Sequence, residues 1–239
     1  MADPLVFFSR IVIAVMTIPI IAAIINWKKL DKSLKIFFVF CLVTFLISLG
    51  ETIFVWHARS HKEFWGPILG WWGIENTHFI QILAFLRDYL ILGYFFKLIL
   101  TPRPIANWIW AIALLLALSS TINYLFIEGY KDPGIFNPAA DAIFCFSIPM
   151  VSLWYLYKRD TRIEIYKNPV FWISLGLILP NLLSLFLYFT ADFLNENNYP
   201  LYVNLMLVKN FFEIIGIILL SIGFSHAYYM RFFYPIASK

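Results

Sequence analysis

Six ionisable residues lie inside long apolar stretches of this sequence. Three are basic and three are acidic: Arg10, Glu51, Arg87, Asp88, Lys209 and Glu213. An ionisable side chain within a membrane-spanning helix is costly unless it is paired, and such residues typically mark binding sites, ion pathways or proton relays. The six residues therefore predict a site that recognises a charged or polar group. We expect the amides of Asn123 and Asn181 to add hydrogen bonds to this site.

The spacing of these residues predicts how they pair. Lys209 and Glu213 are four residues apart, so on a helix they share a face and can form an ion pair. Arg87 and Asp88 are adjacent in the sequence, which predicts that they point to different neighbouring helices. We expect Arg87 to pair with Glu51, and Asp88 to pair with Lys209 or with Arg10, the sixth of these charges.

Histidines predict a second, alternative chemistry. His57 and His61 are four residues apart, so both imidazoles share a face if their helix continues. With His78, and with Glu75 or Glu51, they predict a zinc site of the kind found in intramembrane hydrolases. The alternative is that these histidines are solvated at the membrane interface. The tryptophan-rich stretch 57–77 is expected to be an interfacial loop or a lid.

The composition identifies the solvent around these residues. Of 239 residues, 62% are hydrophobic and only 13% are charged, whereas soluble domains carry about 25% charged residues. This excludes a soluble fold and makes the lipid bilayer the main partner. Cys41 and Cys145 lie in apolar runs and are interpreted as small core residues. Nothing in the charge pattern indicates nucleic-acid binding.

The apolar runs are long and uninterrupted, which favours helices over a β-barrel. A spanning helix needs about 20 mainly apolar residues. We predict one all-α, integral membrane domain over residues 1–239 with seven transmembrane helices: Pro4–Asn26, Leu34–Trp56, His78–Leu100, Ile105–Ile127, Ala139–Tyr157, Pro169–Ala191 and Leu201–Met230.

Basic residues predict the orientation, because cytoplasmic links carry an excess of Lys and Arg. Three of the 18 basic residues fall on one side of the predicted bundle and twelve on the other. The N-terminus is therefore expected outside and the C-terminus in the cytosol, in a plasma or bacterial inner membrane. Asp141 is assigned to the outer face. The twelve are Lys28, Lys29, Lys32, Lys35, Lys97, Arg103, Lys158, Arg159, Arg162, Lys167, Arg231 and Lys239.

In this orientation the charges within the spans lie about 8 to 18 Å from the outer ends of their helices, at 1.5 Å per residue. Overlapping depths predict a single polar pocket open to the outside. The alternative is a structural network of ion pairs that fixes helix register.

Short similarities between the two halves predict an internal repeat. Pro19 and Pro149 lie in Thr-Ile-Pro-Ile and Ser-Ile-Pro-Met, and Ile-Ser-Leu-Gly occurs in the second and sixth spans. We interpret these as a parallel 3+1+3 repeat of residues 4–100 and 139–230, joined by a linker helix at 105–127. Chance similarity between apolar helices is the alternative.

A seven-helix chain with such a repeat resembles the superfamily that groups SWEET sugar transporters, PQ-loop proteins and microbial rhodopsins. Pro19 and Pro149 look like the hinge prolines of the SWEET and PQ-loop proteins, which implies transport of a small solute. Lys209 and Asp88 are similar in position to the rhodopsin lysine and its counter-ion. That similarity implies retinal on Lys209 as an alternative cofactor.

These observations predict a polytopic membrane protein whose outward-facing polar pocket binds a small polar molecule. We expect it to be a transporter and not an enzyme. One alternative is a receptor or sensor subunit, which would need a separate cytosolic signalling partner because the inner loops are short. The others are a retinal-binding protein and an intramembrane metal hydrolase. Each of these four functions is compatible with a homo-oligomer.

Overall fold

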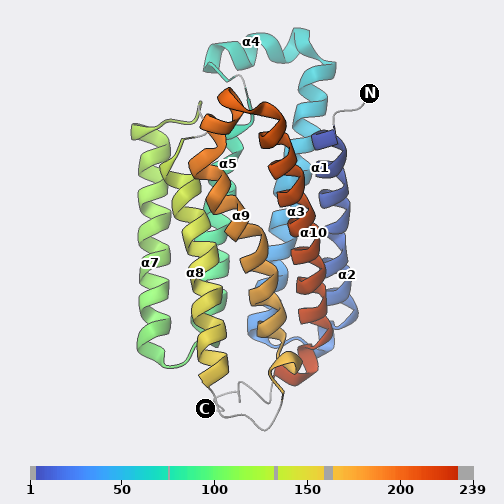
Figure 1. Cartoon of the computed structure of the whole chain (residues 1–239), viewed down its shortest axis with the longest axis vertical. Helices are drawn as coiled ribbons and strands as arrows, with labels where there is room; N and C mark the ends of the chain where they lie inside the picture. The colour runs from blue at the N-terminus through green and yellow to red at the C-terminus, as the bar shows by residue number, and fades with distance from the viewer. Residues whose placement is uncertain (1–3, 75, 132–133, 159–163, 231–239) are drawn as a thin grey trace.

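The computed structural model describes residues 4–74, 76–131, 134–158 and 164–230, and these residues are almost entirely helical, with no strand among them. Figure 1 shows most helices running along one long axis, with α4 lying across one end. The helices are α1 Pro4–Val15, α2 Thr17–Ile25, α3 Lys32–Ser60, α4 Lys62–Trp72, α5 His78–Arg87, α6 Gly93–Ile99, α7 Arg103–Ile122, α8 Phe136–Lys158, α9 Pro169–Asn197 and α10 Tyr199–Ser225.

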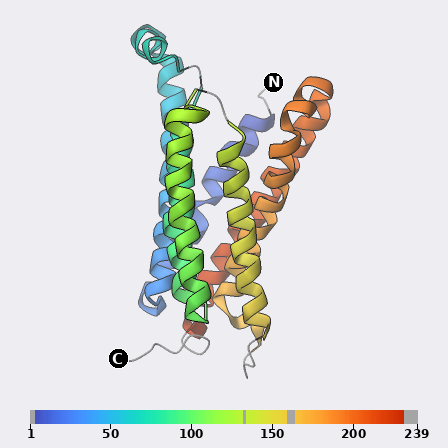
Figure 2. The ribbon, with the colours of Figure 1, turned by 90° about the vertical axis from the view of Figure 1, so that its left-hand side faces the viewer.

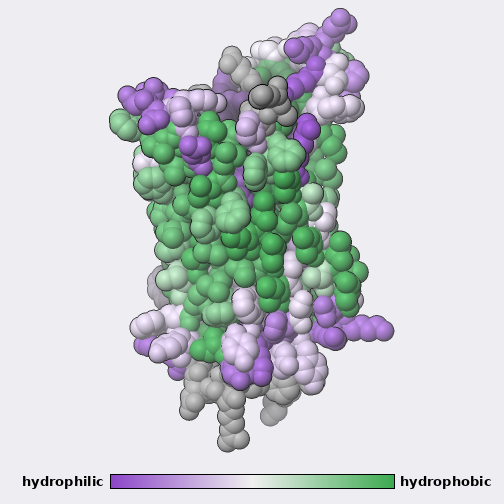
Figure 3. Space-filling view, turned by 45° about the vertical axis from the view of Figure 1, so that its right-hand side comes forward, coloured by the Kyte–Doolittle hydropathy of each residue, from purple (hydrophilic) through white to green (hydrophobic). Residues whose placement is uncertain are grey.

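Six helical segments among the described residues are long and apolar enough to cross a membrane. They are formed by α1 with α2, by α3, by α7 with the π-helical turn that follows it, and by α8, α9 and α10. Figure 3 shows an apolar band between two polar ends of the molecule. Large apolar side chains are exposed within the segments, as at Trp108 and Leu115 of α7. The prediction of an all-α membrane protein is confirmed at this level.

The remaining long segment carries an adjacent pair of opposite charges near its middle. Helices α5 and α6 are joined by a π-helical turn, Asp88–Leu92, into an uninterrupted helical path in the same bundle (Figure 1). This path contains Arg87, Asp88 and Lys97 and packs against α3 and α7.

The first predicted helix is broken rather than continuous. Helix α1 ends at Val15 and α2 begins at Thr17. Pro19 has no N–H to donate to the Val15 carbonyl, and its ring crowds that carbonyl, which explains a break one turn before it. Pro149, predicted to be an equivalent hinge, lies within an unbroken α8. The two prolines therefore have different effects on their helices, and hinge motion stays a prediction.

The stretch 57–77 is largely helical, so the prediction of an interfacial loop was wrong in its secondary structure. Helix α3 continues to Ser60, and α4 lies across the bundle end (Figure 1). Gly73 ends α4 in the left-handed conformation, with φ of 61°. The Trp71 side chain is 83% exposed, as expected for an aromatic residue at the level of lipid headgroups.

Glu128 fixes the start of α8 to the end of the π-helical turn Asn123–Ile127. Its carboxylate accepts hydrogen bonds from the Phe136 N–H at 3.0 Å, the Asn123 amide at 2.7 Å and the Ile135 N–H at 3.1 Å. Burial opposes ionisation, but the three donors outweigh it and lower the pKa of Glu128 below its ordinary value. Glu128 therefore helps to set the position of α8 relative to α7.

Helices α9 and α10 make the most extensive contact in the bundle and cross at two glycines. The Gly176 carbonyl oxygen lies 2.5 Å from where a Cβ of Gly216 would be, and the Gly216 carbonyl lies 2.7 Å from the corresponding position at Gly176. Only glycine allows this approach, which is typical of close helix packing in membranes. Pro180 also lacks the N–H that would bond to the Gly176 carbonyl.

We expect Gly216→Ala to destabilise the protein by about 1–3 kcal/mol, because the added methyl group collides with the backbone of α9. Gly50→Ala is the matched control, since nothing lies within 4 Å of its Cβ position. Alanine there should be neutral or stabilise α3 by up to about 1 kcal/mol. Thermal unfolding of both variants in detergent, followed by circular dichroism, checks the difference. Equal unfolding midpoints would contradict the packing described for Gly216.

Candidate functional site

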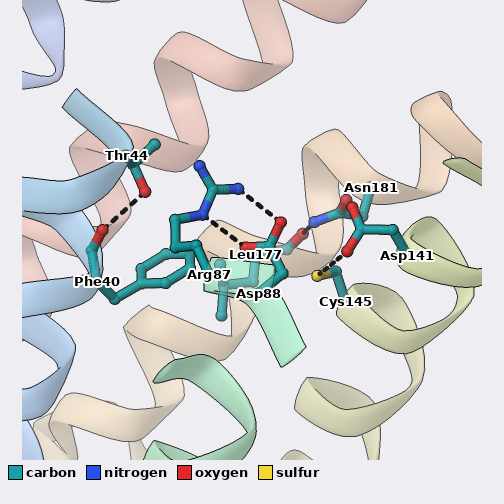
Figure 4. Close-up of polar contacts among 8 residues, drawn as sticks. All are labelled: Phe40, Thr44, Arg87, Asp88, Asp141, Cys145, Leu177 and Asn181. Atoms are coloured by element: carbon teal, nitrogen blue, oxygen red, sulfur yellow. Dashed lines mark hydrogen bonds and ion pairs between the residues drawn. The ribbon is translucent and has the colours of Figure 1, made fainter. Parts of the chain in front are cut away.

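Arg87 and Asp88 form a bidentate ion pair inside the bundle (Figure 4). Arg87 Nε donates to Asp88 Oδ1 at 2.9 Å, and Nη2 donates to Oδ2 at 2.6 Å. The guanidinium also lies 5.2 Å from the centre of the Phe40 ring on α3. The prediction that the two residues pair with different helices was wrong. The arginine side chain is long enough to fold back onto its neighbour, at the point where the π-helical turn begins.

A second carboxylate, that of Asp141, faces this pair from α8. Ligand atoms of Asp88, Asp141 and Cys145 all lie within 4.8 Å of one another. The Cys145 thiol donates to Asp141 Oδ1 at an Sγ–O distance of 3.8 Å. Sequence reasoning missed this cluster, because it assigned Asp141 to the outer face and Cys145 to the core. The spacing of four residues, which places both side chains on one face of a helix, was the available signal.

The cluster has unequal numbers of positive and negative groups. Asp88 is 3% exposed, and the Arg87 side chain is 14% exposed. Two ionised carboxylates beside one guanidinium leave one surplus negative charge, which the apolar interior penalises strongly. A proton or a bound cation would neutralise it. The arrangement can therefore take up a positively charged species.

Lys209 and Glu213 form the predicted ion pair along one face of α10. Lys209 Nζ lies 3.4 Å from Glu213 Oε2, and the two side chains are 28% and 27% exposed. Tyr188 of α9 lies within electrostatic range of this pair and also of Asp88 and Asp141. It is 43% exposed. We call the two ion pairs, together with Asp141 and Tyr188, the polar layer. It is partly accessible and extends from α5 to α10.

A cavity of about 110 Å³ adjoins this layer between α2, α3, α9 and α10. Its lining includes Glu213, Phe40 beneath Arg87, and both Met16 and Pro19 at the break between α1 and α2. Asn181 points toward Asp141 in Figure 4 and donates to the Leu177 carbonyl at 2.7 Å. The polar layer and the interrupted first helix therefore meet at this cavity.

Three of the predicted residues lie outside this polar layer. Arg10 is exposed on α1. Glu51 accepts a hydrogen bond from Thr77 Oγ1 at 2.5 Å, near the end of the bundle that carries α4. Asn123 donates to Glu128 and not to the charges within the bundle. The predicted pairings of Glu51 with Arg87, and of Asp88 with Lys209 or Arg10, were therefore wrong.

The described residues do not complete the predicted zinc site. The rings of His57 and His61 stack with their centres 4.3 Å apart, and His57 Nδ1 accepts a hydrogen bond from Trp65 Nε1 at 2.7 Å. His78 is hydrogen-bonded to Gln81 instead. Glu75 lies outside the described residues. Among the described residues no third ligand lies within reach of the two histidines, and the zinc site stays a prediction.

The arrangement also does not fit a retinal Schiff base. Lys209 pairs with Glu213, and Asp88 pairs with Arg87, so the lysine and its implied counter-ion are separately engaged. The adjoining cavity of about 110 Å³ is smaller than the roughly 300–1,000 Å³ of most small-molecule pockets.

We expect Arg87→Gln to destabilise the protein by about 3–5 kcal/mol, because it leaves the buried Asp88 carboxylate and the half-buried Asp141 carboxylate facing each other without a cation. Asp88→Asn should destabilise the protein less, since the Asp141 carboxylate lies within electrostatic range of Arg87 and still balances the charge of the guanidinium. Thermal unfolding of the two variants in detergent tests this order. The reverse order would show that Asp141 does not belong to the same electrostatic cluster.

No protein family, curated protein or solved structure matches this chain. The function is therefore inferred from the arrangement of its residues alone.

Proposed function

We propose that this protein is a seven-span membrane carrier for a small polar solute, with its N-terminus outside the cell. The seventh crossing segment in this proposal is His78–Ile99, whose two halves flank the Asp88 turn. Helix α1 begins at the end of the bundle where α4 lies, whereas α10 ends at the opposite end (Figure 1). This arrangement agrees with an odd number of crossings.

The distribution of basic residues supports this orientation. Lys28, Lys29 and Arg103 lie in or beside links at the end opposite α4, as the positive-inside rule requires of a cytoplasmic face. Four of the twelve basic residues counted for that face, Arg159, Arg162, Arg231 and Lys239, lie outside the described residues.

Cysteine labelling tests the orientation and the seventh span together. Ser60→Cys should react with a membrane-impermeant maleimide in intact cells, whereas Thr101→Cys should react only after permeabilisation. Both native residues are exposed, and they lie on either side of the segment 78–99. The unsubstituted chain is the background control, because Cys41 and Cys145 are buried. Labelling of both sites from the same side would contradict a crossing by residues 78–99.

The polar layer is the observation that carries the proposed binding function. Arg87 with Asp88, and Lys209 with Glu213, present charges of both signs within one layer of the bundle interior. Toward the end that carries α4, the α9–α10 pair diverges from α3 and α7 (Figure 2). A solute that carries charged or polar groups can exchange its hydration for contacts with these side chains.

The helix interruptions favour transport over reception. The π-helical turn begins at Asp88, and the break between α1 and α2 lines the cavity beside Glu213. Interrupted helices at a charged site in mid-membrane are typical of transporters, whose helix segments move during alternating access.

We expect a small polar compound to co-purify with the protein, detected by mass spectrometry, and to undergo counterflow in proteoliposomes. Glu213→Gln should lower both retention and counterflow at least about tenfold, the equivalent of about 1.4 kcal/mol. Arg10→Gln is the matched control, because it removes an exposed charge outside the polar layer. Retention without counterflow would identify a receptor instead. Loss in both variants alike would contradict the proposed site.

A further inference from the structure

The cluster of Asp88, Asp141 and Cys145 has the donor set of a transition-metal site. Two ligands come from one face of α8, four residues apart, and the third comes from the π-helical turn. Their ligand atoms lie within 4.8 Å of one another. Carboxylate oxygens alone suit Mg²⁺ or Ca²⁺, whereas a thiolate selects softer ions such as Zn²⁺.

The Tyr89 hydroxyl is a second and independent sign of a ligand. Tyr89 is 0% exposed, and among the described residues its hydroxyl makes no hydrogen bond of good geometry, although the Ser120 hydroxyl, also buried without such a bond, lies beside it. This hydroxyl lies within electrostatic range of Asp141, Cys145 and Asp88. A buried hydroxyl without a partner is unfavourable, so a ligand or a ligand-bound water among these residues would satisfy it.

The charges of the cluster balance with a divalent ion. Binding through Cys145 releases the thiol proton to solvent and leaves a thiolate. The thiolate and the Asp88 and Asp141 carboxylates then carry three negative charges, and Arg87 with a divalent cation carries three positive charges. A neutral site is the arrangement that the membrane interior penalises least.

We propose that Asp88, Asp141 and Cys145, with the Tyr89 hydroxyl beside them, bind one divalent transition-metal ion of the Zn²⁺ class. Tetrahedral coordination with bonds of about 2.0–2.3 Å requires the three ligand atoms to move slightly closer together. This site goes beyond the proposed carrier function, because it binds its ion at equilibrium whether or not any solute is transported.

Cobalt provides the test, because a thiolate bound to Co²⁺ gives a sulfur-to-metal charge-transfer band in the near ultraviolet. The full-length protein in lipid nanodiscs should bind one equivalent of Co²⁺ with this band, and Zn²⁺ should displace it. Cys145→Ser should abolish the band and weaken binding at least about tenfold. Cys41→Ser is the matched control, since Cys41 is the other buried cysteine and lies outside the cluster.

Two further variants keep the test decisive. If Cys145→Ser does not fold, Asp141→Asn should weaken Co²⁺ binding while the sulfur band persists at saturation. Replacing His57 and His61 together with alanine should leave binding unchanged. The proposal fails if Co²⁺ binds without a sulfur band, if the band is lost in Cys41→Ser, or if binding depends on the histidines. If the protein binds the metal ion but shows no counterflow of any solute, the proposed carrier function is wrong and the proposed metal site stands.

Discussion

The rest of this structure depends on one requirement, that an arginine buried in the bundle finds its partner inside the protein. Lipid offers no water to Arg87, so its guanidinium takes both oxygens of Asp88. This pairing occurs within one helical path and therefore does not by itself hold two helices together. What it does is set the rotation of that path, with the Arg87 guanidinium over Phe40 of α3 and the Asp88 carboxylate toward Asp141 of α8.

Closely packed helices and interrupted helices both border this charged layer, and Gly176 and Met16 line the same cavity beside Glu213. Gly176 and Gly216 bring α9 and α10 into backbone contact, so a shift between these two helices would break close packing. The break at Met16 and the π-helical turn at Asp88 instead occur where backbone hydrogen bonds are already altered. Both positions lie next to the polar layer.

The sequence predicts side-chain pairs at regular helical spacing better than contacts between helices. The Lys209–Glu213 pair follows from helical spacing alone, and the apolar runs predict the helical segments to within a few residues. Contacts between helices depend on rotation about each axis, which hydropathy does not specify. For this reason Glu51 could be paired wrongly with Arg87. Asp141 was misassigned because a carboxylate near the start of a span can lie at the surface or, one turn deeper, in the bundle.

The surplus carboxylate links ion binding to solute binding. Tyr188 is within electrostatic range of both Asp141 and Lys209, so a cation that neutralises the Asp88–Asp141 pair changes the potential felt at the Lys209–Glu213 pair. Any solute that binds in the polar layer then has an affinity that depends on the cation. By thermodynamic reciprocity the cation's affinity depends equally on the solute. Cation-dependent solute binding of this kind is one of the requirements of coupled transport by a carrier.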